Sequence, residues 1–230
     1  MPLFIDPIYI IFVMIPALVL SGAAQLYLRS TYGTWKERRN SANVNGVETA
    51  RTIMRHYGLN VQLQRVQQEL GDHFNPSDQS VGMSPHIADA PSIASMAVAA
   101  HEFGHVQQYH ENSPLIAVRT ALLPVAQFGN YGAYILILLG VFLNFFGLAL
   151  LGLILFGGVV LFSVLTLPVE FDASRRAMKM LNEVGLIKTQ EDRRGAQAVL
   201  RAAALTYVAA TAGAILNFAY YALLVFSSRD

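Results

Sequence analysis

The residues with the clearest chemical potential are His101-Glu102-Phe103-Gly104-His105. Two histidines four positions apart on a helix point the same way, so their ring nitrogens can reach one metal ion. The glutamate after the first histidine completes the H-E-x-x-H pattern of zinc peptidases, in which it takes a proton from the attacking water. The pattern predicts zinc-dependent hydrolysis of peptide bonds, with His101 and His105 as metal ligands and Glu102 as the catalytic base.

An alanine-rich stretch leads into this motif. It begins at Pro91-Ser92, and both residue types are typical of the start of a helix, so we expect the motif to lie on a helix, as a zinc peptidase requires. The alternative is a pair of surface histidines on an amphipathic helix, and a third ligand elsewhere in the chain would argue against it.

The composition indicates an integral membrane protein. Hydrophobic residues make up 54% of the 230 positions and charged residues 13%, and the mean hydropathy is +0.42; these values are unusual for a soluble domain. Four apolar stretches are long enough to cross a bilayer when a tight turn at Asn144 is allowed between the middle two. We expect spans in residues 8–28, 130–145, 147–167 and 202–226.

The charges predict how these spans are oriented. Four crossings place segments 29–129 and 168–201 on one side of the membrane, and all of the 16 lysines and arginines except Arg229 fall on that side. The positive-inside rule then makes both segments cytoplasmic and leaves both termini outside. The formal net charge of +1, without a basic stripe, argues against a nucleic-acid partner. Absence of cysteine excludes disulfides and thiolate ligands.

Glu170 is the best candidate for a third zinc ligand, because it emerges where the third span returns to the side of the histidines. Its alternative role is that of a solvated acid at the membrane boundary, or of an ion pair with Arg175 or Arg176 on the same helix. A compact H-E-x-x-H-x-x-G-x-x-H site would instead use Glu111, but Gln108 occupies the position that requires glycine. Asp172 is a candidate for orienting a ligand histidine. Four histidines are set aside as surface or structural groups: His56, His73, His86 and His110.

The cytoplasmic segments are expected to form a small α+β part. Residues 46–57 suggest a helix capped by Asn45, and residues 59–65 alternate as a strand does. A hairpin is expected from residues 73–76 and 80–84 around the polar tip 77–79, and its outer edge could add a substrate peptide as a further strand. These segments are too short to fold apart from the spans, so residues 1–230 are treated as one membrane-integrated domain.

Three segments carry a family resemblance: 99–105, 167–177 and 199–208. Together they resemble the YugP-like neutral zinc metallopeptidases, which are small bacterial membrane proteins. The resemblance covers nearly the whole chain. It implies a zincin-like, gluzincin-type site in the bacterial inner membrane, with His101, His105 and Glu170 holding Zn²⁺ and Glu102 as the base. More distant gluzincins carry aspartate four positions after the glutamate ligand, where this chain has Ser174; Asp172 is taken as its substitute.

The sequence therefore predicts a mainly α-helical membrane zinc endopeptidase that cuts membrane or membrane-near proteins from the cytoplasmic side. Besides substrate and lipid, a membrane partner protein or a homo-oligomer is compatible with the glycine and aromatic residues in the spans. The alternative is an inactive membrane scaffold or partner subunit with a structural zinc site, although Glu102 has no role in such a site.

Overall fold

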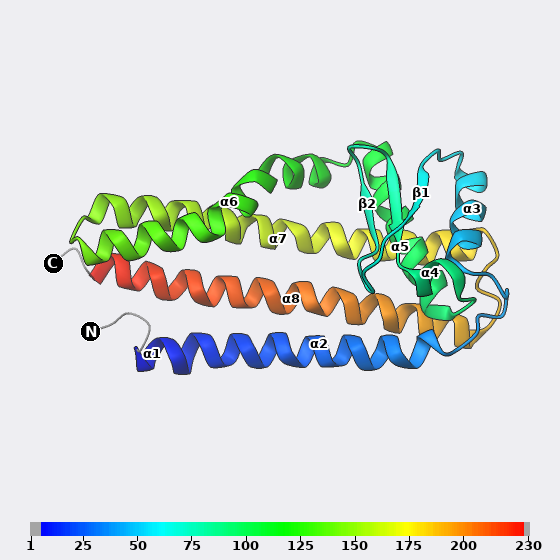
Figure 1. The fold of residues 1–230 in the computed structure, drawn as a ribbon, viewed down its shortest axis with the longest axis horizontal. Coiled ribbons are helices and arrows are strands. Elements are labelled where there is room, and N and C mark those ends of the chain that lie inside the picture. The colour runs from blue at the N-terminus through cyan, green and yellow to red at the C-terminus, as the bar shows by residue number, and fades with distance from the viewer. Residues whose placement is uncertain (1–5, 228–230) are drawn as a thin grey trace. The chain divides into compact units, whose positions relative to one another are not determined.

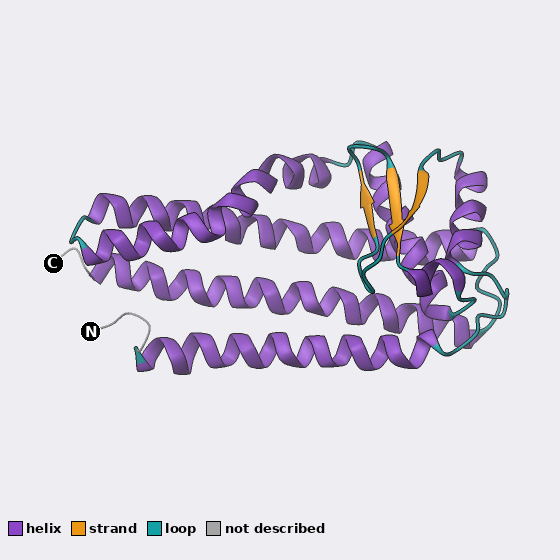
Figure 2. Ribbon diagram, viewed as in Figure 1, coloured by secondary structure: helices purple, strands orange, loops and turns teal. Residues whose placement is uncertain are grey.

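The computed structural model describes residues 6–227 of the chain, apart from the side chain of Asn130. Helices account for most of it, and three strands form one small sheet (Figure 2). The terminal residues used in the topology prediction, 1–5 and 228–230, lie outside the described residues. The elements in chain order are α1 (Pro7–Tyr9), a π-helical turn (Ile10–Met14), α2 (Ile15–Lys36), α3 (Gly46–Tyr57), β1 (Gln62–Arg65), β2 (His73–Asn75), β3 (Ser80–Met83), α4 (Pro85–Asp89), α5 (Ile93–His110), α6 (Pro114–Phe142), α7 (Phe146–Glu183) and α8 (Gln190–Ser227) (Figure 1).

The chain divides into two compact units. Unit 1 comprises residues 1–25, 117–168 and 205–230, and unit 2 comprises residues 26–116 and 169–204. Charge is distributed very unevenly between them, since unit 1 contains only Arg119 and Arg229 among the lysines and arginines. Every residue of the H-E-x-x-H motif and Glu170 belong to unit 2.

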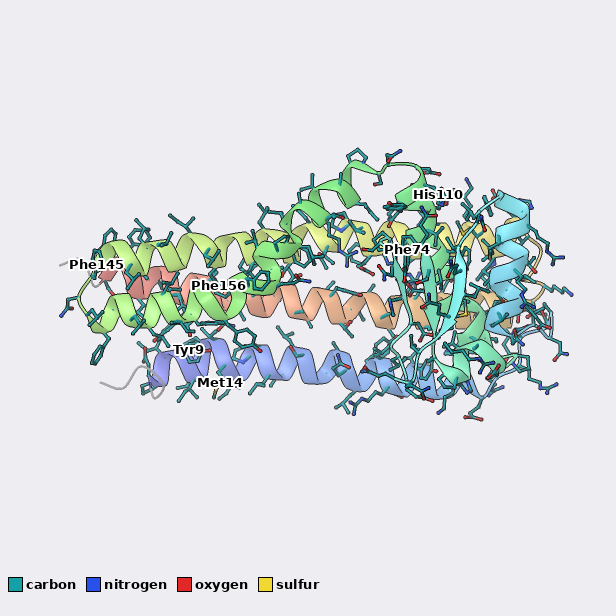
Figure 3. The ribbon with its side chains drawn as sticks, turned by 45° about the horizontal axis from the view of Figure 1, so that its top comes forward. Tyr9, Met14, Phe74, His110, Phe145 and Phe156 are labelled. Carbon is teal, nitrogen blue, oxygen red and sulfur yellow. The ribbon has the colours of Figure 1, made fainter. Side chains whose placement is uncertain are left out.

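Unit 1 is apolar and is held together by aromatic packing and a few polar contacts between helices. Its core surrounds Phe156 of α7, which is labelled in Figure 3, and Tyr221 of α8. The Thr211 hydroxyl donates to the carbonyl oxygen of Ser163 at 3.2 Å, as expected for a polar residue at a helix interface. Many large apolar side chains are exposed on this unit, Phe142 at 81% and Phe128 at 78% among them.

Three helices are long and apolar enough to cross a membrane: Pro7–Lys36, Phe146–Glu183 and Gln190–Ser227. They contain the first, third and fourth predicted spans. The second predicted span, 130–145, falls mostly on α6, which satisfies the same criterion only when Pro114–Gly129 and Tyr131–Phe142 are taken together across a 50° bend. The described residues therefore give three candidate spans, and four if the bent pair counts as one.

The sheet of unit 2 has the strand order β1-β3-β2. The predicted hairpin is present, with Phe74 of β2 opposite Val81 of β3 in antiparallel pairing. The predicted strand 59–65 is shorter, since β1 begins at Gln62, and it pairs in parallel with β3. This arrangement places β3 in the centre and leaves β2 as an edge strand that contacts α5.

The core of unit 2 surrounds α5. This helix is buried on most of its surface, which explains its many alanines: residues of small volume let neighbouring elements pack closely around it. Elements α3, α4 and the sheet pack against it, and the same core includes Leu181 of α7 and Val199 of α8. A single buried helix thus carries the metal-binding motif through the centre of unit 2.

Candidate zinc site

Helix α5 positions the histidine pair. It begins as the sequence predicts, with Ser92 as the N-cap whose hydroxyl accepts a hydrogen bond from the backbone N–H of Ser95 at 3.0 Å. His101 and His105 lie one turn apart on the face of α5 toward α7, and their ring centroids are 4.9 Å apart. Both side chains are mostly buried, at 15% and 12% exposure.

Helix α7 brings Glu170 to these histidines. Its Oε2 lies 3.3 Å from Nε2 of His101 and 3.6 Å from Nε2 of His105, and the three potential ligand atoms all lie within 4.8 Å of one another. Glu170 is 2% exposed. Arg175 and Arg176, the partners of the alternative interpretation, both pair with Asp172.

These distances fit a zinc ion. Zinc binds histidine nitrogen and carboxylate oxygen at about 2.0–2.2 Å, so neighbouring corners of a tetrahedral site lie roughly 3.3–3.6 Å apart. The separations of Glu170 Oε2 from the two Nε2 atoms fall in this range. Two imidazoles and one carboxylate are also the donor types of catalytic zinc sites, which keep a fourth position open.

Electrostatics couple the carboxylate to the imidazoles. Burial alone would raise the pKa of Glu170, but the imidazoles of His101 and His105 beside its carboxylate outweigh burial and place this pKa well below its ordinary value. Burial likewise opposes the charged form of His105, yet the neighbouring carboxylates of Glu170 and Glu102 raise its pKa. In the metal-free protein Glu170 therefore bears the negative charge that a cation at this position would compensate.

Glu102 is buried beside the histidines. It is 6% exposed, and its charge acts on His105 and on Asp72, whose pKa is raised mainly by burial and also by Glu102. Within residues 6–227 no hydrogen bond to the Glu102 carboxylate is found. A water molecule close to it could therefore donate a hydrogen bond to this carboxylate. This environment suits a group that takes a proton from water.

Gln108 and Ser174 contact the ring nitrogens that face away from Glu170. The Oε1 atom of Gln108 lies 3.0 Å from Nδ1 of His105, and the Ser174 hydroxyl lies 3.3 Å from Nδ1 of His101. Ser174, four positions after Glu170, thus lies beside the outer ring nitrogen of His101. Asp172 bonds Gln108 at 2.9 Å and so reaches His105 through it.

Sequence reasoning missed Gln108 as part of the site. In the sequence it stands out only as the residue that breaks a glycine-containing motif, although it lies three positions after His105 and therefore on the same helix face. The residue that the compact motif would have used, Glu111, pairs with Arg176 at 2.6 Å. Of the histidines set aside, His73 bonds the Gly71 carbonyl oxygen at 2.9 Å.

Known proteins match along nearly the whole chain. Residues 10–226 match the family described as "Putative neutral zinc metallopeptidase". A relative from Bacillus subtilis (strain 168), described as "Putative membrane protease YugP", is 37% identical over 221 residues, which cover 96% of this chain and 98% of the relative. No solved structure matches. The matched range includes all of α5 and the part of α7 that carries Glu170.

Proposed function

We propose that this chain, which belongs to the family of putative neutral zinc metallopeptidases, is a membrane-integrated zinc endopeptidase of the gluzincin type. Its membership in the family confirms the resemblance noted from the sequence. Membership implies a zinc ion as cofactor and a protein or peptide as substrate. The observation that carries the residue assignment is the grouping of His101, His105 and Glu170 around one position, with Glu102 buried beside it.

In the proposed mechanism His101, His105 and Glu170 hold the ion. Bound zinc supplies Lewis-acid chemistry, because it polarises a carbonyl and lowers the pKa of water. Glu102 accepts the proton of the attacking water and passes it to the leaving amine, as a general base and then a general acid. Its low exposure favours this proton transfer, since few solvent molecules compete for the carboxylate.

The free edge of β2 is proposed to hold the substrate. This strand lies at the edge of the sheet and contacts α5, with the Phe74 and Tyr109 rings 5.7 Å apart; Phe74 and His110, at the end of α5, are labelled in Figure 3. An extended peptide that adds to such an edge is held by main-chain hydrogen bonds, which read little of its sequence. This mode suits an enzyme that cuts unfolded or membrane-near segments.

Membrane integration is supported by the three candidate spans and by the exposed apolar side chains of unit 1. Lipid would cover these side chains in place of water. All lysines and arginines except Arg119 and Arg229 fall in unit 2, so the positive-inside rule favours a cytoplasmic active site and external termini. Four crossings, with α6 as a bent span, are consistent with this orientation.

Metal content and casein cleavage of the detergent-purified protein test the proposal. We expect stoichiometric zinc in the wild type and in Glu102→Gln, with turnover reduced about 10²- to 10⁴-fold in the variant because the base is lost. Glu170→Ala should lose zinc. The exposed Glu37 provides a matched control, and Glu37→Gln should behave as wild type.

The scaffold alternative predicts a different result. A structural site would bind zinc without any cleavage in the wild type, and Glu102→Gln would change nothing. A wild type that binds no zinc would refute the proposed function altogether.

A further inference from the structure

The Gln108 side chain connects the two helices that carry the proposed zinc ligands. It is 1% exposed, and both ends of its amide are hydrogen-bonded. Oε1 lies 3.0 Å from Nδ1 of His105 on α5, and Nε2 lies 2.9 Å from the carbonyl oxygen of Val169 and 2.9 Å from Oδ2 of Asp172, both on α7. Val169 directly precedes Glu170.

The partners on α7 fix which way the amide faces. A backbone carbonyl oxygen and a carboxylate paired with arginines offer only acceptors, so the amide NH₂ group must point toward them. The carboxylate of Asp172 is held in place by Arg175 and by Arg176, whose Nε donates to Oδ2 at 2.6 Å. The amide oxygen of Gln108 is therefore directed at His105.

This orientation decides the protonation of the imidazole. Because the Gln108 amide oxygen can only accept, Nδ1 of His105 must carry the proton and donate it. The other ring nitrogen, Nε2, is the one that lies 3.6 Å from Glu170 Oε2. Its lone pair is thus available to a metal in the neutral ring, and the ring plane is fixed by the same hydrogen bond.

We propose that Gln108 is a positioning residue for zinc: it sets the tautomer and orientation of His105 and holds His105 in register with Glu170. Histidine ligands commonly donate their second ring proton to a carboxylate or a backbone carbonyl. Here the amide oxygen of Gln108 serves as that acceptor. The carboxylate of Asp172 does not contact His105 directly but accepts a hydrogen bond from the NH₂ group of Gln108. The inference rests on the proposed zinc site, and it names Gln108 as the direct partner of His105.

Zinc affinity, measured by competition with a chromophoric chelator on the detergent-purified full chain, tests this role. Gln108→Met keeps the side-chain length and removes the hydrogen bonds, and we expect zinc to bind about 10- to 100-fold more weakly. Gln107→Met is the control, since Gln107 is the preceding residue of the same helix, and its affinity should equal that of the wild type.

A charge-conserving exchange separates hydrogen bonding from packing. In the double variant Gln108→Glu with Asp172→Asn, a carboxylate accepts from Nδ1 of His105 and the new amide at 172 donates to its second oxygen. We expect this exchange to recover part of the affinity lost in Gln108→Met, since the hydrogen bond to the Val169 carbonyl oxygen is not restored.

Three results of the affinity measurement would overturn the proposal: wild-type affinity in Gln108→Met, an equal loss in Gln107→Met, or a double variant that binds no better than Gln108→Met. Failure of the wild type itself to bind zinc would instead overturn the proposed function, and the role of Gln108 with it. Thermal unfolding of Gln108→Met beside the wild type separates a loss of zinc affinity from misfolding: the proposal expects a folded variant that binds zinc weakly, and a variant that binds weakly only because it does not fold would overturn it.

Discussion

Gly104, inside the H-E-x-x-H motif, lies where α5 meets α7. A side-chain carbon at this position would lie 3.0 Å from both the Cα and the carbonyl carbon of Ala173, and closer still to the Ala173 carbonyl oxygen. All three atoms are backbone, so they cannot move aside as a flexible side chain can. Gly104→Ala is therefore expected to push α5 away from α7.

The size of this displacement follows from ordinary contact distances. Carbon atoms not bonded to each other approach to about 3.5–4.0 Å, so the helices must separate by roughly 0.5–1 Å to admit the methyl group. His101 and His105 lie on α5 and Glu170 on α7, so the ligand separations of 3.3 and 3.6 Å should lengthen by a similar amount. Zinc sites hold their distances to about 0.2 Å, and a misplacement near 1 Å costs about 100-fold in turnover.

Zinc affinity and casein turnover are the sharper assays for Gly104→Ala. Overpacking costs about 1–3 kcal/mol and alanine regains about 1 kcal/mol of helix propensity over glycine, so the net loss of stability is only about 0–2 kcal/mol and does not distinguish this contact from any other overpacked site. Gly33→Ala is the control, because nothing lies within 4 Å of a carbon added there; it should leave zinc binding unchanged. Wild-type zinc affinity and turnover in Gly104→Ala would refute the reasoning that this contact sets the ligand spacing.

Two other substitutions test a residue next to the proposed zinc ligands and a buried carboxylate that stabilises the fold away from them. Ser174→Ala removes a 3.3 Å contact to Nδ1 of His101, and chelator competition should show less than the tenfold loss typical of a stronger outer partner; a larger loss would contradict this ranking. Asp192 is 1% exposed, and although burial would raise its pKa, hydrogen bonds from Ser41 and Thr189 lower this pKa below its ordinary value. Because this pKa is lowered, Asp192 stabilises the fold above its unfolded pKa, and that stabilisation disappears as pH falls through the folded value. Thermal unfolding should show Asp192→Asn less stable than the wild type at pH 7, and this difference in stability should shrink below about pH 4. The zinc stoichiometry of the variant should be unchanged. A difference in stability that persists in acid would contradict the stabilising role of the ionised Asp192 carboxylate.

The sequence predicts those elements whose signals are local. The helix 46–57 is found with those bounds, and its start is stabilised by the capping box between Asn45 and Glu48 that this pattern favours. The hairpin forms around its polar tip, and the H-E-x-x-H helix begins after Ser92. Each of these depends on residues within a few positions of one another, so tertiary packing had little opportunity to override it.

Features that depend on distant parts of the chain were harder to predict. The parallel pairing of β1 with β3 passes over β2 in the chain order, and no local pattern specifies it. Helix α6 begins at Pro114, well before the predicted span 130–145, and bends by 50° between Gly129 and Tyr131, where that span was predicted to begin. The roles of Gln108 and Ser174 are visible only once α5 and α7 are packed together, because each side chain bonds a group on the other helix.

The candidate site is therefore the product of one helix–helix contact. The histidines come from α5 and the glutamate from α7, while Gly104 allows the backbones to approach and Gln108 fixes their register. The motif alone explains why two imidazoles face the same way, but it does not place a third ligand about 3.5 Å from them. That spacing depends on Gly104, which has no side chain, and on Gln108, whose amide NH₂ group faces only hydrogen-bond acceptors on α7. A chain could keep H-E-x-x-H and Glu170 and still bind zinc poorly if either feature of this contact changed.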